Sequence, residues 1–254
     1  MTSPDARPPL REALLLVAGT GSRLRPLTDD RPKCLLEVDG KPLLRRLLEQ
    51  LISAGIERVI FTTGYLHDTL METIRSWELP LAIEEVYGDT FDSENNAVSL
   101  GLGLGALQDR RFLLCDGDIL LRDPAPIQTI VDAPHDNALA LMRFQHMGAE
   151  EMKMIVDDDA RIVTLGKSIP LDEAHGESLG IQKIGPSAFD ALNRHLEAMD
   201  ADERRDLYYE DIFTRLINEG IPFYGCELAP EGWTEIDTPA DLDAARELAL
   251  TWPD

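Results

Sequence analysis

The sequence is poor in several features that mark particular classes of protein. Its 254 residues include only three cysteines, Cys34, Cys115 and Cys226, which lie far apart and form no CxxC pair. This pattern argues against a disulfide framework and against a structural zinc site, and it favours a reducing cytoplasm. No apolar run approaches the roughly 20 residues that a membrane-spanning helix needs. Cys115 ends an apolar run and is expected to be a buried, unreactive thiol.

Basic residues are also scarce, and their distribution is uneven. Acidic residues outnumber basic ones by 47 to 24, which gives a net charge of −23. This excess argues against nucleic acid or an anionic membrane as a partner. The segment from Arg23 to Arg46, here called the basic segment, nevertheless has a net charge of +3. A small polyanion bound at the basic segment would explain this local positive charge, and chance clustering of basic residues is the alternative.

Strands and helices alternate through the first half of the chain. Apolar runs predict strands at residues 14–18, 58–65, 81–86 and 112–115. Helical spacing predicts helices from about residue 42 to Gly55, at 66–75, and from a Ser93 cap through residue 104. This alternation predicts a parallel sheet with helices on both faces, in which ligands bind beyond the carboxyl ends of the strands. The Gly19 loop, Tyr65 and the Asp116–Asp118 pair all fall at such ends.

The second half is richer in strands. We expect strands at residues 137–142, 152–158, 161–166, 178–184 and 222–226, and helices at 186–199 and 209–218. A final helix has Pro239 at its first position, with Asp237 or Thr238 as its cap. No linker divides the chain, so residues 1–254 are interpreted as one domain. Residues 1–12 are polar and rich in proline, which favours a flexible tail.

The most informative stretch is LLLVAGTGSRLRPLTDDRPK, which joins the first strand to the basic segment. Gly19 and Gly21 let backbone N–H groups approach anionic oxygens, and Arg23 and Lys33 supply positive charge. The stretch is not a Walker A loop, and Leu24 occupies the third glycine position of a dinucleotide fingerprint. A phosphate site of another kind is therefore predicted, with a tight turn carrying surface cations as the structural alternative.

The residues VAGTGSRLRPLTDDRPK resemble the signature of the sugar-phosphate nucleotidyltransferases, LAAGxGxRLxPLTxxxPK. The resemblance continues in order through PLLRRLLEQLISAGIERVIFTTGY, CDGDILL and WTEIDTPADL. Val17 stands where the family usually has alanine, which puts the contacts with the base in question. SENNAVSLGLG, GKSIPLDEAHGESLGIQKI and YYEDIF are similar to segments of the short, phosphocholine-type cytidylyltransferases. The resemblance implies an α/β, Rossmann-like nucleotidyltransferase fold, with a mostly parallel central sheet, helices on both faces and a β-rich acceptor-side elaboration.

The resemblance also implies a reaction. A phosphate or phosphonate acceptor would attack the α-phosphate of a nucleoside triphosphate, with Mg²⁺ as cofactor and pyrophosphate as leaving group. CTP and a phosphocholine-like acceptor are the expected small-molecule substrates, bound by residues 13–133 and 134–254 respectively. The first alternative is a sugar-1-phosphate nucleotidyltransferase that uses dTTP, UTP or GTP. The second is a nucleotide-sensing subunit without turnover. No nucleic acid or membrane partner is expected, and a homodimer is left open.

The resemblance assigns roles to particular residues. Arg23 would hold the outer phosphates and Lys33 the α-phosphate, while Asp118 and Asp237 would bind Mg²⁺, with Asp116 as the alternative to Asp118. The expected nucleotide-binding residues are Val17, Ala18, Gly19, Thr20, Gly21, Ser22, Arg23, Lys33, Tyr65, Asn95, Asn96 and Asp116. The expected acceptor-binding residues are Lys167, Glu177, Tyr209, Glu210, Asp211 and Trp233. Helix capping remains open for the asparagines, and core packing for the aromatic residues.

Overall fold

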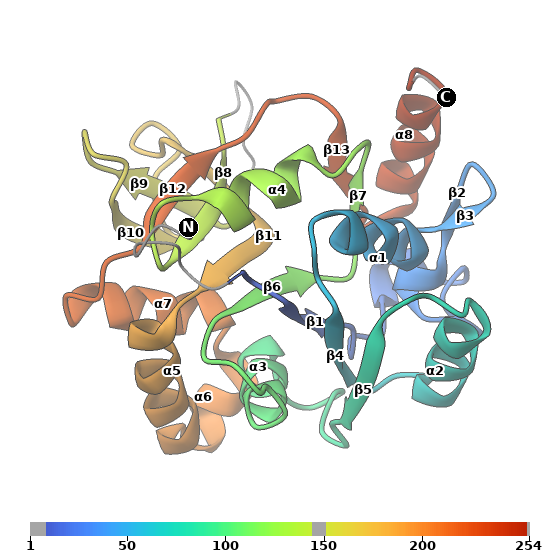
Figure 1. Cartoon of the computed structure of the whole chain (residues 1–254), viewed down its shortest axis with the longest axis horizontal. Helices are drawn as coiled ribbons and strands as arrows, with labels where there is room; N and C mark the ends of the chain where they lie inside the picture. The colour runs from blue at the N-terminus through green and yellow to red at the C-terminus, as the bar shows by residue number, and fades with distance from the viewer. Residues whose placement is uncertain (1–8, 144–150, 253–254) are drawn as a thin grey trace, which may run out of the picture.

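One mixed sheet organises the protein, and the computed structural model in Figure 1 describes residues 9–143 and 151–252. Within these residues nine strands form the sheet, in the order β10-β9-β11-β6-β1-β4-β5, with β8 paired to β11 and β12 paired to β8. None of the helices in the described ranges has the length and apolar character needed to span a membrane.

Four strands of the first half run parallel to one another. They are β1 (Glu12–Leu16), β4 (Arg58–Thr63), β5 (Ala82–Tyr87) and β6 (Phe112–Asp116). Leu15 pairs with Phe61 on one side and with Cys115 on the other, so the three strands end at the same edge. The expected parallel sheet is therefore confirmed for this half, and its carboxyl edge carries the glycine loop.

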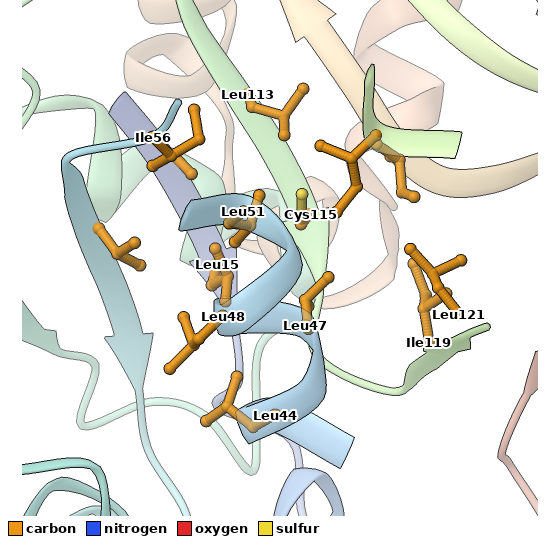
Figure 2. Close-up of a cluster of buried hydrophobic side chains, with 14 of the residues drawn as sticks. Leu15, Leu44, Leu47, Leu48, Leu51, Ile56, Leu113, Cys115, Ile119 and Leu121 are labelled. Atoms are coloured by element: carbon orange, nitrogen blue, oxygen red, sulfur yellow. The ribbon is translucent and has the colours of Figure 1, made fainter. Parts of the chain in front are cut away.

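Helices cover both faces of the sheet because alternate strand residues point to opposite sides. Leu15 packs with the leucines of α1 (Leu43–Ser53), as Figure 2 shows, and α2 (His67–Ser76) and α4 (Ala125–Asp132) contribute to the same cluster. Leu14 faces the other cluster, built with α3 (Asn96–Leu104), α5 (Pro186–Ala198) and α7 (Tyr209–Asn218). Gly55, at φ 90°, ends the turn after α1 as expected.

The β-rich elaboration is mostly antiparallel. Strand β11 (Gly176–Ile184) runs antiparallel to β6 and joins the elaboration to the parallel half. It also pairs with β8 (Ala138–Met142) and β9 (Lys153–Val156), while β10 (Ile162–Gly166) extends the edge. Strand β12 (Tyr224–Glu227) lies parallel to β8. The expected fold class is confirmed, with the antiparallel strands gathered on the β11 side.

The C-terminal segment returns to the first half. Strand β13 (Trp233–Glu235) pairs with β7 (Ile119–Leu121), and α8 (Pro239–Ala249) lies beside the short β2 (Glu37–Val38) and β3 (Lys41–Pro42) hairpin (Figure 1). Ile236 and Leu242 are buried there with Leu24, Leu43 and other residues of the first half. This segment, expected in the acceptor-binding half, thus packs against the first half, and its return brings Asp237 to the glycine loop.

Several expected boundaries need correction. Strand β1 begins at Glu12 and Leu10 is buried, so ordered structure starts inside the expected 1–12 tail, of which residues 1–8 lie outside the described residues. The cap of α3 is Asn95 and not Ser93, because the Asn95 side chain accepts from the Asn96 N–H. Helices α4 and α6 (Ala201–Asp206) and strand β7 were not predicted. Thr238 caps α8, which decides between the two expected caps.

Candidate active site

A cavity of about 830 Å³ opens at the carboxyl ends of β1 and β6. The glycine loop, the start of α3, β11, the start of α7 and β13 all contribute to its walls. Most of the expected site residues line it: Val17, Ala18, Gly19, Thr20, Gly21, Ser22, Arg23, Lys33, Asn95, Asn96, Asp116, Asp118, Lys167, Glu177, Glu210, Trp233 and Asp237. Of the expected residues, Tyr65, Tyr209 and Asp211 are not part of its lining.

The two proposed metal ligands meet at one lysine. Lys33 Nζ lies 2.7 Å from Asp118 Oδ2 and 2.6 Å from Asp237 Oδ1. An Arg23 nitrogen lies 2.8 Å from the same Asp237 oxygen. Burial lowers the pKa of Lys33, but the two carboxylates outweigh burial and raise it well above its usual value. Burial raises the pKa of Asp237, and the two cations reverse this and leave it below its usual range. Lys33 and Asp237 are therefore ionised at neutral pH.

The donor set of this cluster fits magnesium. Both aspartates present carboxylate oxygens to a single cationic point at the cavity wall, where Lys33 Nζ now lies. Magnesium takes oxygen ligands and is commonly held by one or two carboxylates together with substrate phosphates. Asp116 points elsewhere, because its Oδ2 accepts from the Tyr209 hydroxyl at 2.7 Å. This geometry favours Asp118 over Asp116 as the ligand.

Contacts with neighbouring residues hold the glycine loop in its conformation. Gly21 has φ 59°, a left-handed conformation, and an added Cβ would lie 3.0 Å from the Lys33 Cβ. The Thr28 hydroxyl donates to the Gly21 carbonyl at 2.9 Å. The Tyr65 hydroxyl lies 2.9 Å from the Thr28 carbonyl, so Tyr65 braces the loop from outside the cavity. Tyr65 was expected to pack by the nucleotide, and the structure places it behind the loop and outside the cavity lining.

Val17 lies close to Gly117, the residue between the two aspartates of CDGD. It is nearly buried, at 7% exposure, and it lines the cavity. A Cβ on Gly117 would collide with Val17 Cγ1. The larger side chain at position 17 is thus accommodated by a glycine across from it.

Asn95 and Asn96 line the cavity, and their side chains also make hydrogen bonds within the protein. Asn95 caps α3 and donates to the Asp206 carbonyl at 3.2 Å. Asn96 Oδ1 accepts from the Tyr209 N–H at 3.0 Å. Both side chains thus fasten α3 to the chain around α6 and α7. The capping alternative is confirmed for Asn95.

The cavity is also lined by a group of carboxyl side chains, here called the acidic wall: Asp116, Glu177, Glu210 and Glu235. Burial is the first cause that raises the pKa of each, to about 7 for Glu177 and for Glu210, and well above the usual range for Asp116 and Glu235. The Glu235 side chain is in contact with solvent in the cavity. Repulsion from Asp118 and Asp116 is a second cause that raises its pKa. Glu210 is only 8% exposed, and its Oε2 has no hydrogen-bond partner among the described residues. This wall therefore suits a positively charged ligand group.

Two of the expected acceptor-binding residues lie outside the cavity lining. Tyr209 is fully buried, and its hydroxyl holds Asp116 and accepts from Gln182 Nε2 at 3.1 Å. Asp211 accepts from the Tyr208 N–H at 2.8 Å and so serves the first turn of α7. Successive residues of a helix point about 100° apart. Of the consecutive residues Tyr209, Glu210 and Asp211, only Glu210 consequently faces the cavity.

Sequence reasoning missed other lining residues, among them Glu235, Glu151, Ser178 and Tyr208. Glu235 stands two residues before Asp237, and alternation along an extended chain was the signal that could place both on one side. The centroid of the Tyr208 ring lies 4.2 Å from Lys167 Nζ. Lys167 therefore contacts an aromatic face at the wall of the cavity.

Comparison with known proteins agrees with this geometry. The model of the MobA-like NTP transferase domain matches residues 13–205. The chain belongs to this family. It is therefore a nucleotidyltransferase, as the glycine-loop signature predicted.

Relatives of this family member include named cytidylyltransferases. It is 25% identical to the 2-aminoethylphosphonate cytidylyltransferase of Lancefieldella rimae over 240 residues, which cover 93% of this chain and 90% of that one. It is 26% identical to the CTP:phosphoglutamine cytidylyltransferase of Campylobacter jejuni over 253 residues, 92% and 99% of the two chains. The structure of the inositol-1-phosphate CTP transferase from T. maritima superposes with a TM-score of 0.82 at 24% identity, covering 96% and 97%. This last likeness confirms the fold.

Proposed function

We propose that this nucleotidyltransferase is a magnesium-dependent cytidylyltransferase whose acceptor is a small phosphate or phosphonate with a cationic group. The observation that carries the proposal is the division of charge within one cavity. Arg23 and Lys33 lie at the glycine loop, and the acidic wall lines the same cavity. A zwitterionic acceptor fits both sides, since its anion turns toward the cations and its ammonium toward the carboxyl groups.

The chain's own residues supply alignment and charge. The glycine loop would bind the triphosphate through backbone N–H groups, with Arg23 on the outer phosphates. Lys33 would stabilise the charge that develops as the acceptor oxygen bonds to the α-phosphorus and the bond to pyrophosphate breaks. Asp118 and Asp237 would hold Mg²⁺, which offsets phosphate charge when bound. No nucleophilic side chain is required; Cys115 is fully buried, and burial raises the pKa of its thiol well above its usual value.

The choice of CTP rests on the relatives. Two proteins that match more than nine tenths of this chain are named as cytidylyltransferases, and their names give different acceptors. The acidic wall favours an amine among such acceptors, with phosphocholine first and 2-aminoethylphosphonate second. Carboxylates also accept hydrogen bonds from hydroxyl groups, so an inositol phosphate or a sugar 1-phosphate is the competing acceptor class.

A substrate matrix tests the proposal. Pyrophosphate release would be measured with CTP, UTP, dTTP, ATP and GTP, each against phosphocholine, phosphoethanolamine, 2-aminoethylphosphonate, inositol phosphate and several sugar 1-phosphates. We expect the highest kcat/KM with CTP and an amine-bearing acceptor. The Glu210→Gln variant should lose more activity with the amine than with any residual hydroxylic acceptor. A preference for dTTP, UTP or GTP with a sugar 1-phosphate would overturn the cytidylyltransferase assignment and support the sugar alternative.

A further inference from the structure

The carboxylates assigned to the metal already have a cation between them. Lys33 Nζ contacts Asp118 Oδ2 and Asp237 Oδ1, at 2.7 and 2.6 Å, and Arg23 contacts the same oxygen of Asp237. Two positive and two negative charges therefore meet at this wall of the cavity. Lys33 is the more enclosed of the two cations, with its side chain 16% exposed against 63% for Arg23.

This arrangement is incompatible with a metal ion at the same point. Magnesium lies about 2.0–2.1 Å from its oxygen ligands. An ion bound to the two oxygens that Lys33 contacts would occupy the position of the ammonium group. An ion bound through the other two oxygens would face that ammonium at close range, and the two positive charges would repel each other. Binding of the metal thus requires Lys33 to move.

Only the side chain needs to move. The Lys33 backbone belongs to the short helix Lys33–Leu35, in which Cys34 and Leu35 are buried. A Cβ added at Gly21 would lie 3.0 Å from the Lys33 Cβ, so the side chain of Lys33 starts next to the glycine loop. The flexible four-carbon stem of lysine allows the ammonium to swing from the aspartates toward a phosphate bound on that loop.

We propose that Lys33 is an exchangeable counter-cation, which holds Asp118 and Asp237 together in the free protein and competes with the divalent ion for them. The inference rests on the metal assignment made under the proposed function. A bound triphosphate gives Lys33 and Arg23 new partners and frees the aspartates. Metal and nucleotide therefore promote each other's binding through this one side chain, in addition to their contact with each other.

Binding of Mn²⁺ to the full-length protein without nucleotide separates the possibilities, with free Mn²⁺ measured by electron paramagnetic resonance. Lys33→Met keeps the length of the side chain and removes its charge. We expect Mn²⁺ to bind this variant at least about tenfold more tightly than wild type, within the usual range of coupling between two ligands. The matched control is Lys41→Met, which removes a lysine paired with Glu49 outside the cavity and should leave the affinity unchanged.

Equal or weaker Mn²⁺ binding by folded Lys33→Met would overturn the inference. Lys33→Gln provides the same test if the methionine variant does not fold. Asp237→Asn distinguishes this failure from failure of the proposed function. If Mn²⁺ binds Asp237→Asn as well as wild type, with and without an α,β-methylene analogue of CTP, the metal assignment itself is wrong.

Discussion

Replacing Tyr209 by phenylalanine isolates the contact that holds the acidic wall in place. The Tyr209 hydroxyl donates to Asp116 Oδ2 at 2.7 Å and accepts from Gln182 Nε2 at 3.1 Å. Tyr209 and Gln182 are both fully buried. Phenylalanine keeps the ring and its packing against Phe213, at 5.4 Å between centroids, and removes only the hydroxyl group.

The expected loss follows from the groups left behind. A buried donor or acceptor without a partner costs about 1–3 kcal/mol. For a protein of this size each kcal/mol corresponds to about 2–4 °C in Tm, so Tm should fall by about 2–12 °C. The loss should grow with pH. Burial raises the pKa of Asp116, whereas the Tyr209 hydroxyl lowers it, so the variant's Asp116 keeps its proton to higher pH. Over the pH range in which Asp116 is protonated in the folded variant but not in folded wild type, the variant's free energy of unfolding falls more steeply as pH rises.

Thermal unfolding at several pH values measures this loss, and acceptor KM reports the effect on the site. Tyr224→Phe is the control, because it also removes only a tyrosine hydroxyl and keeps a packed ring, which in Tyr224 stacks on His135. We expect that variant to unfold within about 0.5 kcal/mol of wild type. An unchanged Tm for Tyr209→Phe throughout the pH range would refute the view that this hydroxyl secures Asp116.

Three further changes test other parts of the site. Asp237→Asn should lower kcat about a hundredfold or more with the fold intact, whereas Asp243→Asn on the exposed face of α8 should not; full activity of Asp237→Asn would remove it from the mechanism. The pKa of Glu210 is raised from 4.5 to about 7, so its proton-linked stability is present below pH 4.5 and is lost as pH rises through 7. Glu210→Gln should therefore melt at a higher temperature than wild type at about pH 8 and at the same temperature at about pH 4; equal melting at both would contradict this. Gly117→Ala should cost about 1–3 kcal/mol by collision with Val17, and Val17→Ala should restore most of it in the double variant, as denaturant unfolding would show.

The sequence by itself determined the elements of the first half and the chemistry of the glycine loop. Apolar runs and helical spacing are local signals, so the positions of β1, β4, β6 and α1 followed from the residues within each element. The positions of Gly19 and Gly21 next to Arg23 and Lys33 predicted a phosphate loop for the same reason. The start of α8, with its Thr238 cap followed by Pro239, could also be predicted from the sequence, because capping involves residues only a few positions apart.

The tertiary structure decided which distant residues meet. Lys33 and Asp237 are 204 positions apart, and only the return of β13 and α8 to the first half joins them. The acidic wall depended on the orientation of α7 and β13. A rotation of one residue along α7 turns Tyr209 into the core and Glu210 into the cavity, and β13 adds Glu235. Periodicity shows which residues share a face of an element, but the partner of that face is set by packing between elements far apart in the sequence.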